Sequence, residues 1–215
     1  GIDSEKATVC YNGSNEQYKP ISEGEKKVIR DKYSRGKKYF VFVGALSPRK
    51  NVDGLLRSFE IFKERYNIDF KLLIVGGTLH KTGEIEKVYS EMKHKYDVIF
   101  TGRLETDELC KVVAASESLV YIPHFEGFGI PLLEAMYAET AILSGNTTSL
   151  PEVVGDAALT CFPTDYDKVA ENMNHIATNE ELRNSLIEKG RLQRQKFSWQ
   201  LTSERLWNCI KNAIK

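Results

Sequence analysis

The stretch YFVFVGALSPRKNVDGLLRSFEIF, residues 39–62, changes its periodicity halfway along. Residues 39–44 form a short run of aromatic and branched apolar side chains, which is typical of a strand buried on both faces. After Asn51, which we expect to be an N-cap, apolar residues recur at helical spacing at Val52, Leu55, Leu56, Phe59 and Phe62. The stretch therefore predicts a strand, a loop over residues 44–51 and a helix.

The same alternation continues along the chain. Further apolar runs predict strands over residues 8–11, 70–77, 97–100, 118–122, 141–143 and 158–162. Helical patterns lie between most of these runs, and one of them follows Thr106. Ser22 and Glu25 form a capping box that predicts the start of a first helix. Strands and helices in alternation indicate an α/β protein with a doubly wound, Rossmann-like parallel sheet.

Composition excludes several classes of partner and of site. The 215 residues include 30 Lys and Arg and 30 Asp and Glu, so no overall charge attracts nucleic acid or an acidic membrane. The apolar runs are far shorter than the roughly 18 residues that span a membrane, and we expect a soluble chain. The four cysteines form no C-x-x-C pair, which indicates reduced thiols in a cytosolic protein.

The loop GALSPRKN, residues 44–51, carries the first candidate site. Ligands of open α/β sheets bind beyond the carboxyl ends of the strands, where this loop is expected to lie. Arg49 and Lys50 stand at the start of the predicted helix, so both cations and the free N–H groups there can attract a phosphate. On this loop alone, an exposed turn with two idle cations is an equal alternative.

The loop VGGTLHKTGE, residues 75–84, lacks the pattern of a phosphate loop. A Walker A motif needs glycine where His80 stands, directly before Lys81, and the chain has no G-x-G-x-x-G fingerprint. Gly76 and Gly77 are expected to let a ligand or a neighbouring backbone approach closely. A kinase-type or NAD-type site therefore loses support.

The stretch HFEGFGIPLLEAM, residues 124–136, places two glutamates eight positions apart. Gly127 and Gly129 permit backbone conformations that other residues resist, so Glu126 is expected on a turn and Glu134 about one turn into a helix. Free N–H groups between them can serve a sugar or phosphate, and a carboxylate can accept hydrogen bonds from a vicinal diol. A purely structural Glu134, capping or in an ion pair, is the alternative.

Several motifs in order resemble one family. The stretch EGFGIPLLEAM resembles the E-x7-E motif of retaining GT-B glycosyltransferases, and the chain around it resembles the C-terminal, donor-binding half of family 4, the glycosyl transferases group 1. Similar motifs are NGSNEQYKP, FVGALSPRKN, LLIVGG, FTGRLETDEL and TSLPEVVGDAAL. The resemblance implies one half of a GT-B fold with a helical C-terminal tail. We expect an N-terminal strand and linker over 1–22, a nucleotide-sugar-binding Rossmann-like domain over 23–164, and C-terminal helices completing it over 165–215.

The resemblance also implies roles for individual residues. Arg49 and Lys50 would hold the pyrophosphate of a nucleotide-diphosphate sugar and stabilise the charge of the leaving group, with no cofactor or metal required. Glu126 would bind the sugar hydroxyls, and Glu134 would bind the ribose diol. Arg49, Lys50 and Glu126 would be catalytic. The implied donor site comprises Gly44, Arg49, Lys50, Arg103, Leu104, Glu126, Gly127, Phe128, Gly129, Ile130 and Glu134.

The chain departs from the family pattern at two places. His124 stands where a small residue is usual and can alter the sugar or acceptor side of the cleft. The segment Ala138-Glu139-Thr140-Ala141 lacks a turn glycine, which puts the local backbone in question. The acceptor, a glycan or a lipid-linked molecule, would bind to an N-terminal half that is absent here. We therefore expect weak donor binding and little or no turnover from this chain alone.

Other functions stay open at this point. A non-catalytic binding module and a sugar-nucleotide epimerase share the architecture. The run SLPEVVGDAAL, similar to one in bacterial mannosyltransferases, gives a slight preference for GDP-mannose as the donor. A cytoplasmic location is expected, with peripheral contact of the full-length protein at the inner face of the membrane left open. The basic side chains of the tail can touch anionic lipid or form a solvated face: Arg183, Arg191, Arg194 and Lys196.

Overall fold

Parallel strands form a single six-stranded sheet within the residues that this computed structural model describes, 7–77 and 83–214. The strands are β1 (Tyr39–Val43), β2 (Lys71–Val75), β3 (Val98–Gly102), β4 (Ser118–Tyr121), β5 (Ala141–Gly145) and β6 (Leu159–Cys161). Their order in the sheet is β3-β2-β1-β4-β5-β6. Each apolar run predicted from residue 39 onward forms one of these strands, so the α/β class and the Rossmann-like parallel sheet are confirmed.

Helices follow the strands in alternation. They are α1 (Glu23–Ser34), η2 (Pro48–Lys50), α2 (Val52–Tyr66), α3 (Gly83–Glu91), η3 (Lys95–Asp97), α4 (Thr106–Ala114), α5 (Ile130–Tyr137), α6 (Leu150–Val154), α7 (Tyr166–Thr178), α8 (Glu180–Gln193), η4 (Arg194–Lys196) and α9 (Trp199–Ala213). The predicted capping box starts α1: Ser22 Oγ accepts from Glu25 N–H at 3.3 Å, and Ser22 N–H donates to Glu25 Oε2 at 2.9 Å. The helical tail after residue 165 is also confirmed.

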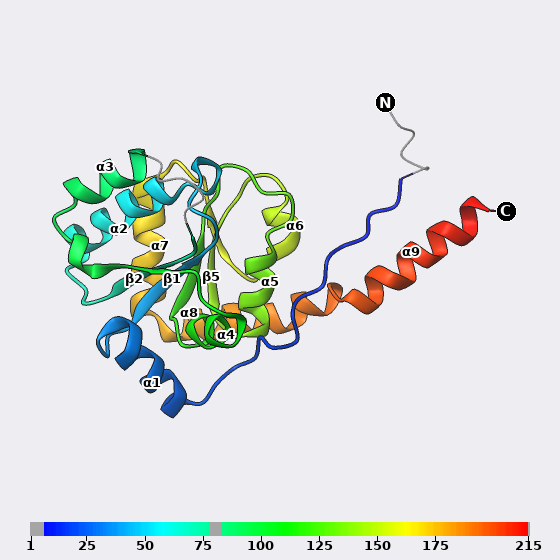
Figure 1. Cartoon of the computed structure of the whole chain (residues 1–215), viewed down its shortest axis with the longest axis horizontal. Coiled ribbons are helices and arrows are strands. Elements are labelled where there is room, and N and C mark those ends of the chain that lie inside the picture. Colours follow the sequence, from blue (N-terminus) through cyan, green and yellow to red (C-terminus); the bar gives the residue numbers. More distant parts are fainter. Residues whose placement is uncertain (1–6, 78–82, 215) are drawn as a thin grey trace.

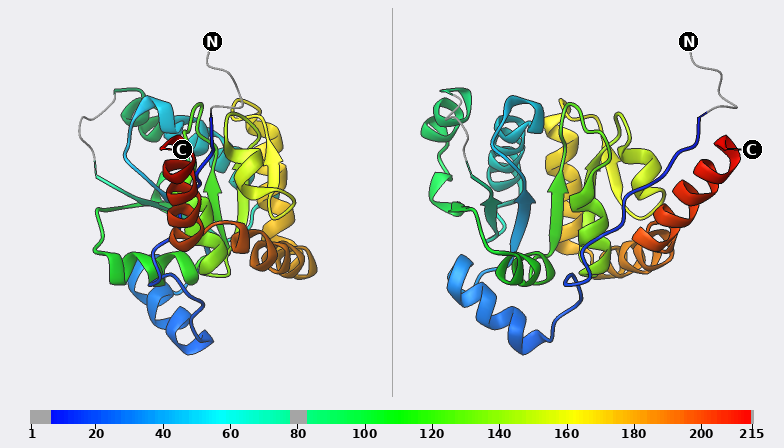
Figure 2. Two further views of the ribbon diagram at one scale, coloured as in Figure 1. Left: turned by 90° about the vertical axis from the view of Figure 1, so that its right-hand side faces the viewer. Right: turned by 45° about the vertical axis from the view of Figure 1, so that its right-hand side comes forward.

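The order of the strands puts helices on both sides of the sheet (Figures 1 and 2). From β1 the chain proceeds outward through β2 to β3, then returns to β4 and proceeds the other way. Because parallel crossovers are right-handed, this reversal places α2 and α3 on one face and α4 and α5 on the other. The final helices complete both layers, since α7 packs against α2 and α8 packs against α5.

The reversal between β1 and β4 is where this fold offers a ligand site. Phe40 of β1 pairs with Leu72 on one side and with Ser118 of β4 on the other. The loops leaving β1 and β4 then lead to opposite faces of the sheet, and a crevice opens between them. The loop predicted at residues 44–51 and the turn predicted at the start of the stretch 124–136 flank this crevice.

The predicted strand over residues 8–11 is wrong. This stretch has no strand partner and lies beside α9, where the side chain of Thr202 donates a hydrogen bond to Tyr11 O. Arg205 also reaches Val9 O, at 3.4 Å. Its carbonyls are therefore satisfied by side chains of α9, which extends away from the sheet in Figure 1. No helix in the described part of the chain is both long and apolar enough to cross a membrane.

Glu139 occupies the turn that lacks a glycine. Its φ is 56°, so it adopts the left-handed conformation in which a glycine has no steric cost. Its carboxylate accepts a hydrogen bond from Arg191 Nε at 2.9 Å and lies 3.7 Å from Arg194. The backbone turn is thus kept, and these two basic side chains of the tail form ion pairs with Glu139.

Gly76 permits the close contact of two loops that the sequence pattern predicted. A Cβ added there would lie 1.9 Å from Gly44 O, whereas a Cβ added at Gly77 would meet no atom within 4 Å.

We expect Gly76→Ala to lower the free energy of unfolding by roughly 1–3 kcal/mol, because the loop after β1 must move. Gly77→Ala is the matched control. Urea denaturation checks this prediction, and equal stability of the two variants would contradict it.

Candidate functional site

Hydrogen bonds join the loops that leave β1 and β4. His124 N–H donates to Arg49 O at 3.0 Å, and Arg49 Nη1 donates to Phe125 O at 3.0 Å. Asn51 Nδ2 donates to Ile122 O at 2.9 Å. These bonds cross the point at which the strand order reverses, so the two loops form one continuous surface at the crevice.

Asn51 is the N-cap residue of α2, as predicted, but its side chain forms no capping hydrogen bond. It is fully buried with φ 55°, and its Nδ2 donates to both Ile122 O and Pro163 O at 2.9 Å. The amide is drawn inward because both carbonyls are buried and need a donor. Gly54 makes the room, since a Cβ there would lie 2.2 Å from Asn51 Oδ1.

Lys50, Arg49 and Glu126 meet at the mouth of this crevice. Lys50 Nζ donates a hydrogen bond to Glu126 Oε2, and Arg49 Nη1 lies 3.4 Å from the same oxygen. The side chains of Lys50 and Glu126 are only 11% and 14% exposed. Burial raises the pKa of Glu126, but hydrogen bonds from Lys50 and Tyr121 outweigh it and lower this pKa to about 2. Two cations and one carboxylate therefore share one small volume.

Tyr121 belongs to this cluster and was missed by the sequence reasoning. Its hydroxyl donates to Glu126 Oε2 at 2.5 Å and accepts a hydrogen bond from Lys50 Nζ. It is the last residue of β4, inside a run that we interpreted only as a buried strand. A hydroxyl-bearing residue at the carboxyl end of a strand beside the reversal was the available signal.

The two glycines of the turn before α5, Gly127 and Gly129, differ in their backbone conformation and contacts. Gly129 has φ 94°, and a Cβ there would lie 2.9 Å from Leu150, so this glycine is required. Gly127, in contrast, has no positive φ, and its N–H donates to Glu126 Oε1 at 3.1 Å. The expectation that it adopts an unusual backbone conformation and has a free N–H is wrong. In the part of the chain that is described, the N–H groups of Phe128 and Gly129 have no intramolecular acceptor.

Side chains of the loop after β5 form hydrogen bonds with the backbone of Glu126. Glu126 N–H donates to Thr148 Oγ1 at 3.3 Å, and Ser149 Oγ donates to Glu126 O at 2.9 Å. The backbone of Glu126 is thus fixed independently of its side chain. This contribution of residues 146–149 was not predicted, because it depends on the packing of α6 and β5 against the turn.

Glu134 lies apart from the cluster, in a more buried place. Burial raises its pKa, and a hydrogen bond with the Tyr18 hydroxyl partly opposes this shift. Tyr18 comes from the linker before α1 and is itself buried, near Cys110 of α4. The two glutamates of the motif therefore occupy opposite electrostatic environments, since the pKa of one is lowered and that of the other is raised.

The other predicted site residues have fewer contacts with the cluster of Arg49, Lys50 and Glu126. Gly44 N–H donates to Val75 O at 3.0 Å, so this amide belongs to the sheet, and a Cβ at Gly44 would approach Lys50 Cε to 3.8 Å. Arg103 and Leu104 follow β3, and Arg103 is exposed without a hydrogen bond or ion pair to other described residues. Ile130 is exposed at the start of α5. Position 80, in the loop without a Walker pattern, lies outside the described residues.

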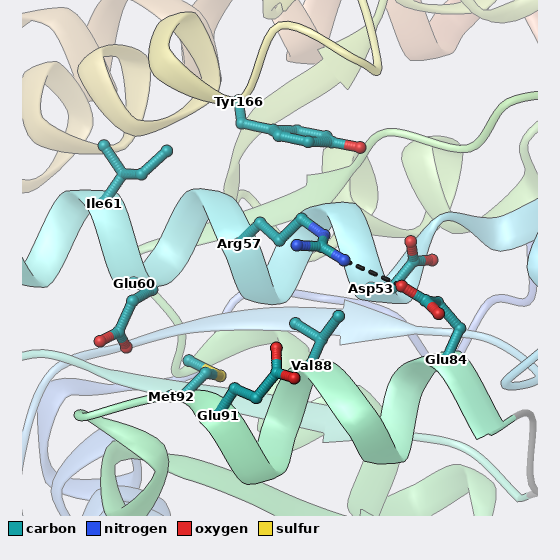
Figure 3. Close-up of a pocket in the computed structure, with 9 residues that line it drawn as sticks. All are labelled: Asp53, Arg57, Glu60, Ile61, Glu84, Val88, Glu91, Met92 and Tyr166. Carbon is teal, nitrogen blue, oxygen red and sulfur yellow. Dashed lines mark hydrogen bonds and ion pairs between the residues drawn. The ribbon is translucent and has the colours of Figure 1, made fainter.

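A second hollow, of about 620 Å³, lies between α2, α3 and the start of α7 (Figure 3). In it Arg57 pairs with Glu84 at 2.9 Å. Four of its nine lining residues are acidic; the nine are Asp53, Arg57, Glu60, Ile61, Glu84, Val88, Glu91, Met92 and Tyr166. It contains none of the predicted site residues and lies among the helices on one face of the sheet. The charged cluster at the crevice therefore remains the candidate site.

A Rossmann-like sheet with two cations at its strand-order reversal is typical of domains that bind an anionic ligand at that point. Residues 25–193 match the family described as Glycosyl transferases group 1, so the chain belongs to this family. O-antigen chain mannosyltransferase B of Escherichia coli is 28% identical over 195 residues, which are 90% of this chain and 51% of that protein. The chain thus spans about half the length of this curated relative.

Solved structures show the same architecture. The crystal structure of Anabaena HepE in complex with UDP and glucose matches with a TM-score of 0.88 and 17% identity, over 99% of this chain and 59% of that one. The C-terminal domain of LpcC, a glycosyl transferase group 1 family protein of Francisella tularensis, matches with a TM-score of 0.73 and 17% identity, over 85% of this chain and 96% of that one. The fold is therefore one half of a GT-B glycosyltransferase, the C-terminal half.

The lowered pKa of Glu126 predicts a dependence of stability on pH. A carboxylate whose pKa falls to about 2 on folding stabilises the fold above its unfolded pKa and loses this contribution as the pH falls toward 2. We expect the wild type to exceed Glu126→Gln in free energy of unfolding by at most about 3 kcal/mol at pH 7, with a smaller difference at pH 3.

Glu134→Gln is the matched control for this measurement. The pKa of Glu134 is raised on folding, so the wild type should gain stability relative to this variant as the pH falls. Urea denaturation at several pH values between 7 and 3 measures both differences. If both differences change in the same direction with pH, the assignment of opposite environments is wrong.

Proposed function

We propose that this chain is the donor-binding half of a retaining glycosyltransferase, which moves a sugar from a nucleotide-diphosphate sugar to a glycan or lipid-linked acceptor. The observation that supports this most is the meeting of Arg49, Lys50 and Glu126 at the strand-order reversal. We further propose the division into a linker over 1–22, a Rossmann-like domain over 23–164, and helices completing it over 165–215. The acceptor would bind to the N-terminal half that longer relatives have.

The cluster suits a diphosphate because Lys50 and Arg49 can exchange Glu126 for the diphosphate as their anionic partner. Glu126 pairs with Lys50 and lies within ion-pair distance of Arg49. A diphosphate offers these cations more negative charge than one carboxylate does, and Lys50 would turn to it. As the bond between sugar and phosphate breaks, both cations stabilise the charge that develops on the leaving diphosphate. Glu126, released from Lys50, can then accept hydrogen bonds from the sugar hydroxyls.

Retention of configuration in this proposal needs no covalent bond to the enzyme. Glu126 is held ionised beside two cations, and its oxygens are engaged by Tyr121 and the Gly127 N–H, so it suits hydrogen bonding to hydroxyls better than attack on carbon. The leaving diphosphate would take the proton from the acceptor hydroxyl as that oxygen attacks the same face of the sugar. The N–H groups of Phe128 and Gly129, which directly precede α5, would hold the sugar and the phosphate.

Glu134 is proposed to bind the ribose, with Arg103 and Leu104 beside the base. Its burial supports this role, because a carboxylate shielded from water forms stronger hydrogen bonds with a diol. GDP-mannose is the donor that we propose first, since a relative covering most of this chain is a mannosyltransferase. HepE binds UDP and glucose, so UDP-sugars belong in the same test. We propose a cytoplasmic location for the full-length protein.

Nucleotide-dependent stabilisation tests the proposal directly. A donor at a hundred times its dissociation constant adds about 2.7 kcal/mol to the free energy of unfolding. We expect GDP-mannose to raise the melting temperature most in a panel of GDP-, UDP- and ADP-sugars at millimolar concentration, measured by differential scanning fluorimetry. Turnover by this chain alone should be slight. If no nucleotide sugar stabilises the chain, the donor-site proposal is wrong.

The proposed ribose contact predicts how Glu134 variants bind. Glu134→Ala removes both acceptor oxygens, and hydrogen bonds to a charged group contribute about 1.5–3 kcal/mol, so we expect every nucleotide diphosphate to bind at least about 10-fold more weakly. Glu134→Gln keeps the shape and should fall between. The control is Glu91→Ala, which changes an exposed carboxylate in the second hollow. Isothermal titration calorimetry measures the affinities, and unchanged binding by Glu134→Ala would assign this residue a structural role only.

A further inference from the structure

The Tyr121 hydroxyl lies between the cation and the carboxylate of the candidate site. It accepts a hydrogen bond from Lys50 Nζ and donates one to Glu126 Oε2 at 2.5 Å. The other carboxylate oxygen, Oε1, accepts from Gly127 N–H at 3.1 Å. A donor at each oxygen fixes both the position and the plane of the Glu126 carboxylate.

Packing alone does not require this hydroxyl. The Tyr121 ring is fully buried and stacks on Phe42, with ring centroids 6.1 Å apart and an angle of 24° between the planes. Lys50 Nζ also lies 5.0 Å from the centroid of the ring. A phenylalanine would make these contacts equally well, without a buried hydroxyl that costs free energy unless it is hydrogen-bonded. The hydroxyl therefore has another use.

The charges around Tyr121 keep its proton in place. Burial and the neighbouring Glu126 raise its pKa, Arg49 opposes them, and Glu134 adds to them more weakly. The hydroxyl is consequently a neutral hydrogen-bond donor at neutral pH. It can remain bonded to Glu126 Oε2 when Lys50 moves away.

We propose that Tyr121 is a positioning residue, whose hydroxyl holds the Glu126 carboxylate toward the donor sugar after Lys50 has turned to the diphosphate. This inference rests on the proposed function of the same site. Once Lys50 Nζ has turned to the diphosphate it no longer donates to Glu126, and without Tyr121 the released carboxylate would keep only the Gly127 N–H. Glu126 would then rotate and lose the orientation in which it accepts from the sugar.

A conservative variant and a matched control test this role. Tyr121→Phe removes the hydroxyl and keeps the ring. Tyr39→Phe makes the same change at an equally buried tyrosine, whose hydroxyl donates to Val112 O at 2.6 Å at the other end of β1 from the crevice. Calorimetry compares a nucleoside diphosphate with the corresponding nucleotide-diphosphate sugar, so the contribution of the sugar is obtained by difference.

We expect Tyr121→Phe to bind the nucleoside diphosphate within about 2-fold of the wild type, while losing most of the additional affinity that the sugar supplies. Loss of a donor raises the pKa of Glu126, so the decline of sugar-dependent binding at acid pH should move to higher pH. Tyr39→Phe should leave both readouts unchanged. A merely structural role for Tyr121 would weaken the nucleoside diphosphate and its sugar ester equally.

The outcomes separate this inference from the proposed function. If the wild type binds no nucleotide diphosphate, the proposed function fails and the role of Tyr121 fails with it. If the wild type binds the sugar ester and Tyr121→Phe matches Tyr39→Phe in both readouts, only the positioning role is overturned. Should Tyr121→Phe not fold, 3-fluorotyrosine at position 121 replaces it. This more acidic phenol should move the acid decline to lower pH, and an unchanged pH profile would overturn the proposal.

Discussion

The buried amide of Asn51 is the interaction on which the candidate site depends. Its Nδ2 donates to Ile122 O and Pro163 O, so one side chain ties the loop after β1 to the loops after β4 and β6. The site exists only while these loops are aligned. Gly54 costs α2 about 1 kcal/mol relative to alanine, yet the space that it leaves is what Asn51 occupies. The glycine thus makes α2 less stable, but it allows the Asn51 hydrogen bonds that hold the loops of the crevice together.

Within the candidate site Glu126 balances the charge of Lys50, and Arg49 leaves a net positive charge. Buried Lys50 would be unfavourable alone, because desolvation of an unpaired cation costs several kcal/mol. Glu126 supplies the opposite charge, and Tyr121 satisfies both. A ligand that carries more negative charge than a carboxylate can replace one of these partners without leaving a charge unpaired. Under the proposed function, this arrangement would favour a diphosphate over a neutral sugar, and it would link the release of Glu126 to the arrival of that diphosphate.

The sequence predicted what depends on neighbouring residues and missed what depends on distant ones. Six strands were found because their side chains are apolar on both faces, and the capping box of Ser22 because its partner is three residues away. Residues 8–11 look like a strand by composition, but their partner is α9, near the other end of the chain. The contacts of Tyr121 with Lys50, of Asn51 with Ile122 and of Tyr18 with Glu134 each join residues more than 70 positions apart. Local periodicity does not specify the strand order that brings these residues together.

Eight positions of sequence separate the glutamates of the motif, but their surroundings differ more than their spacing suggests. A glycosidase pair needs a carboxylate nucleophile or base and a protonated acid placed across one bond, and a lowered and a raised pKa fit that pattern at first sight. The partners argue otherwise. Glu126 faces cations that must also meet the diphosphate, whereas Glu134 is buried against Tyr18 of the linker. Glu126 lies before α5 and Glu134 within it, and each carboxylate has its own contacts. This arrangement suits two carboxylates that bind different parts of one extended ligand.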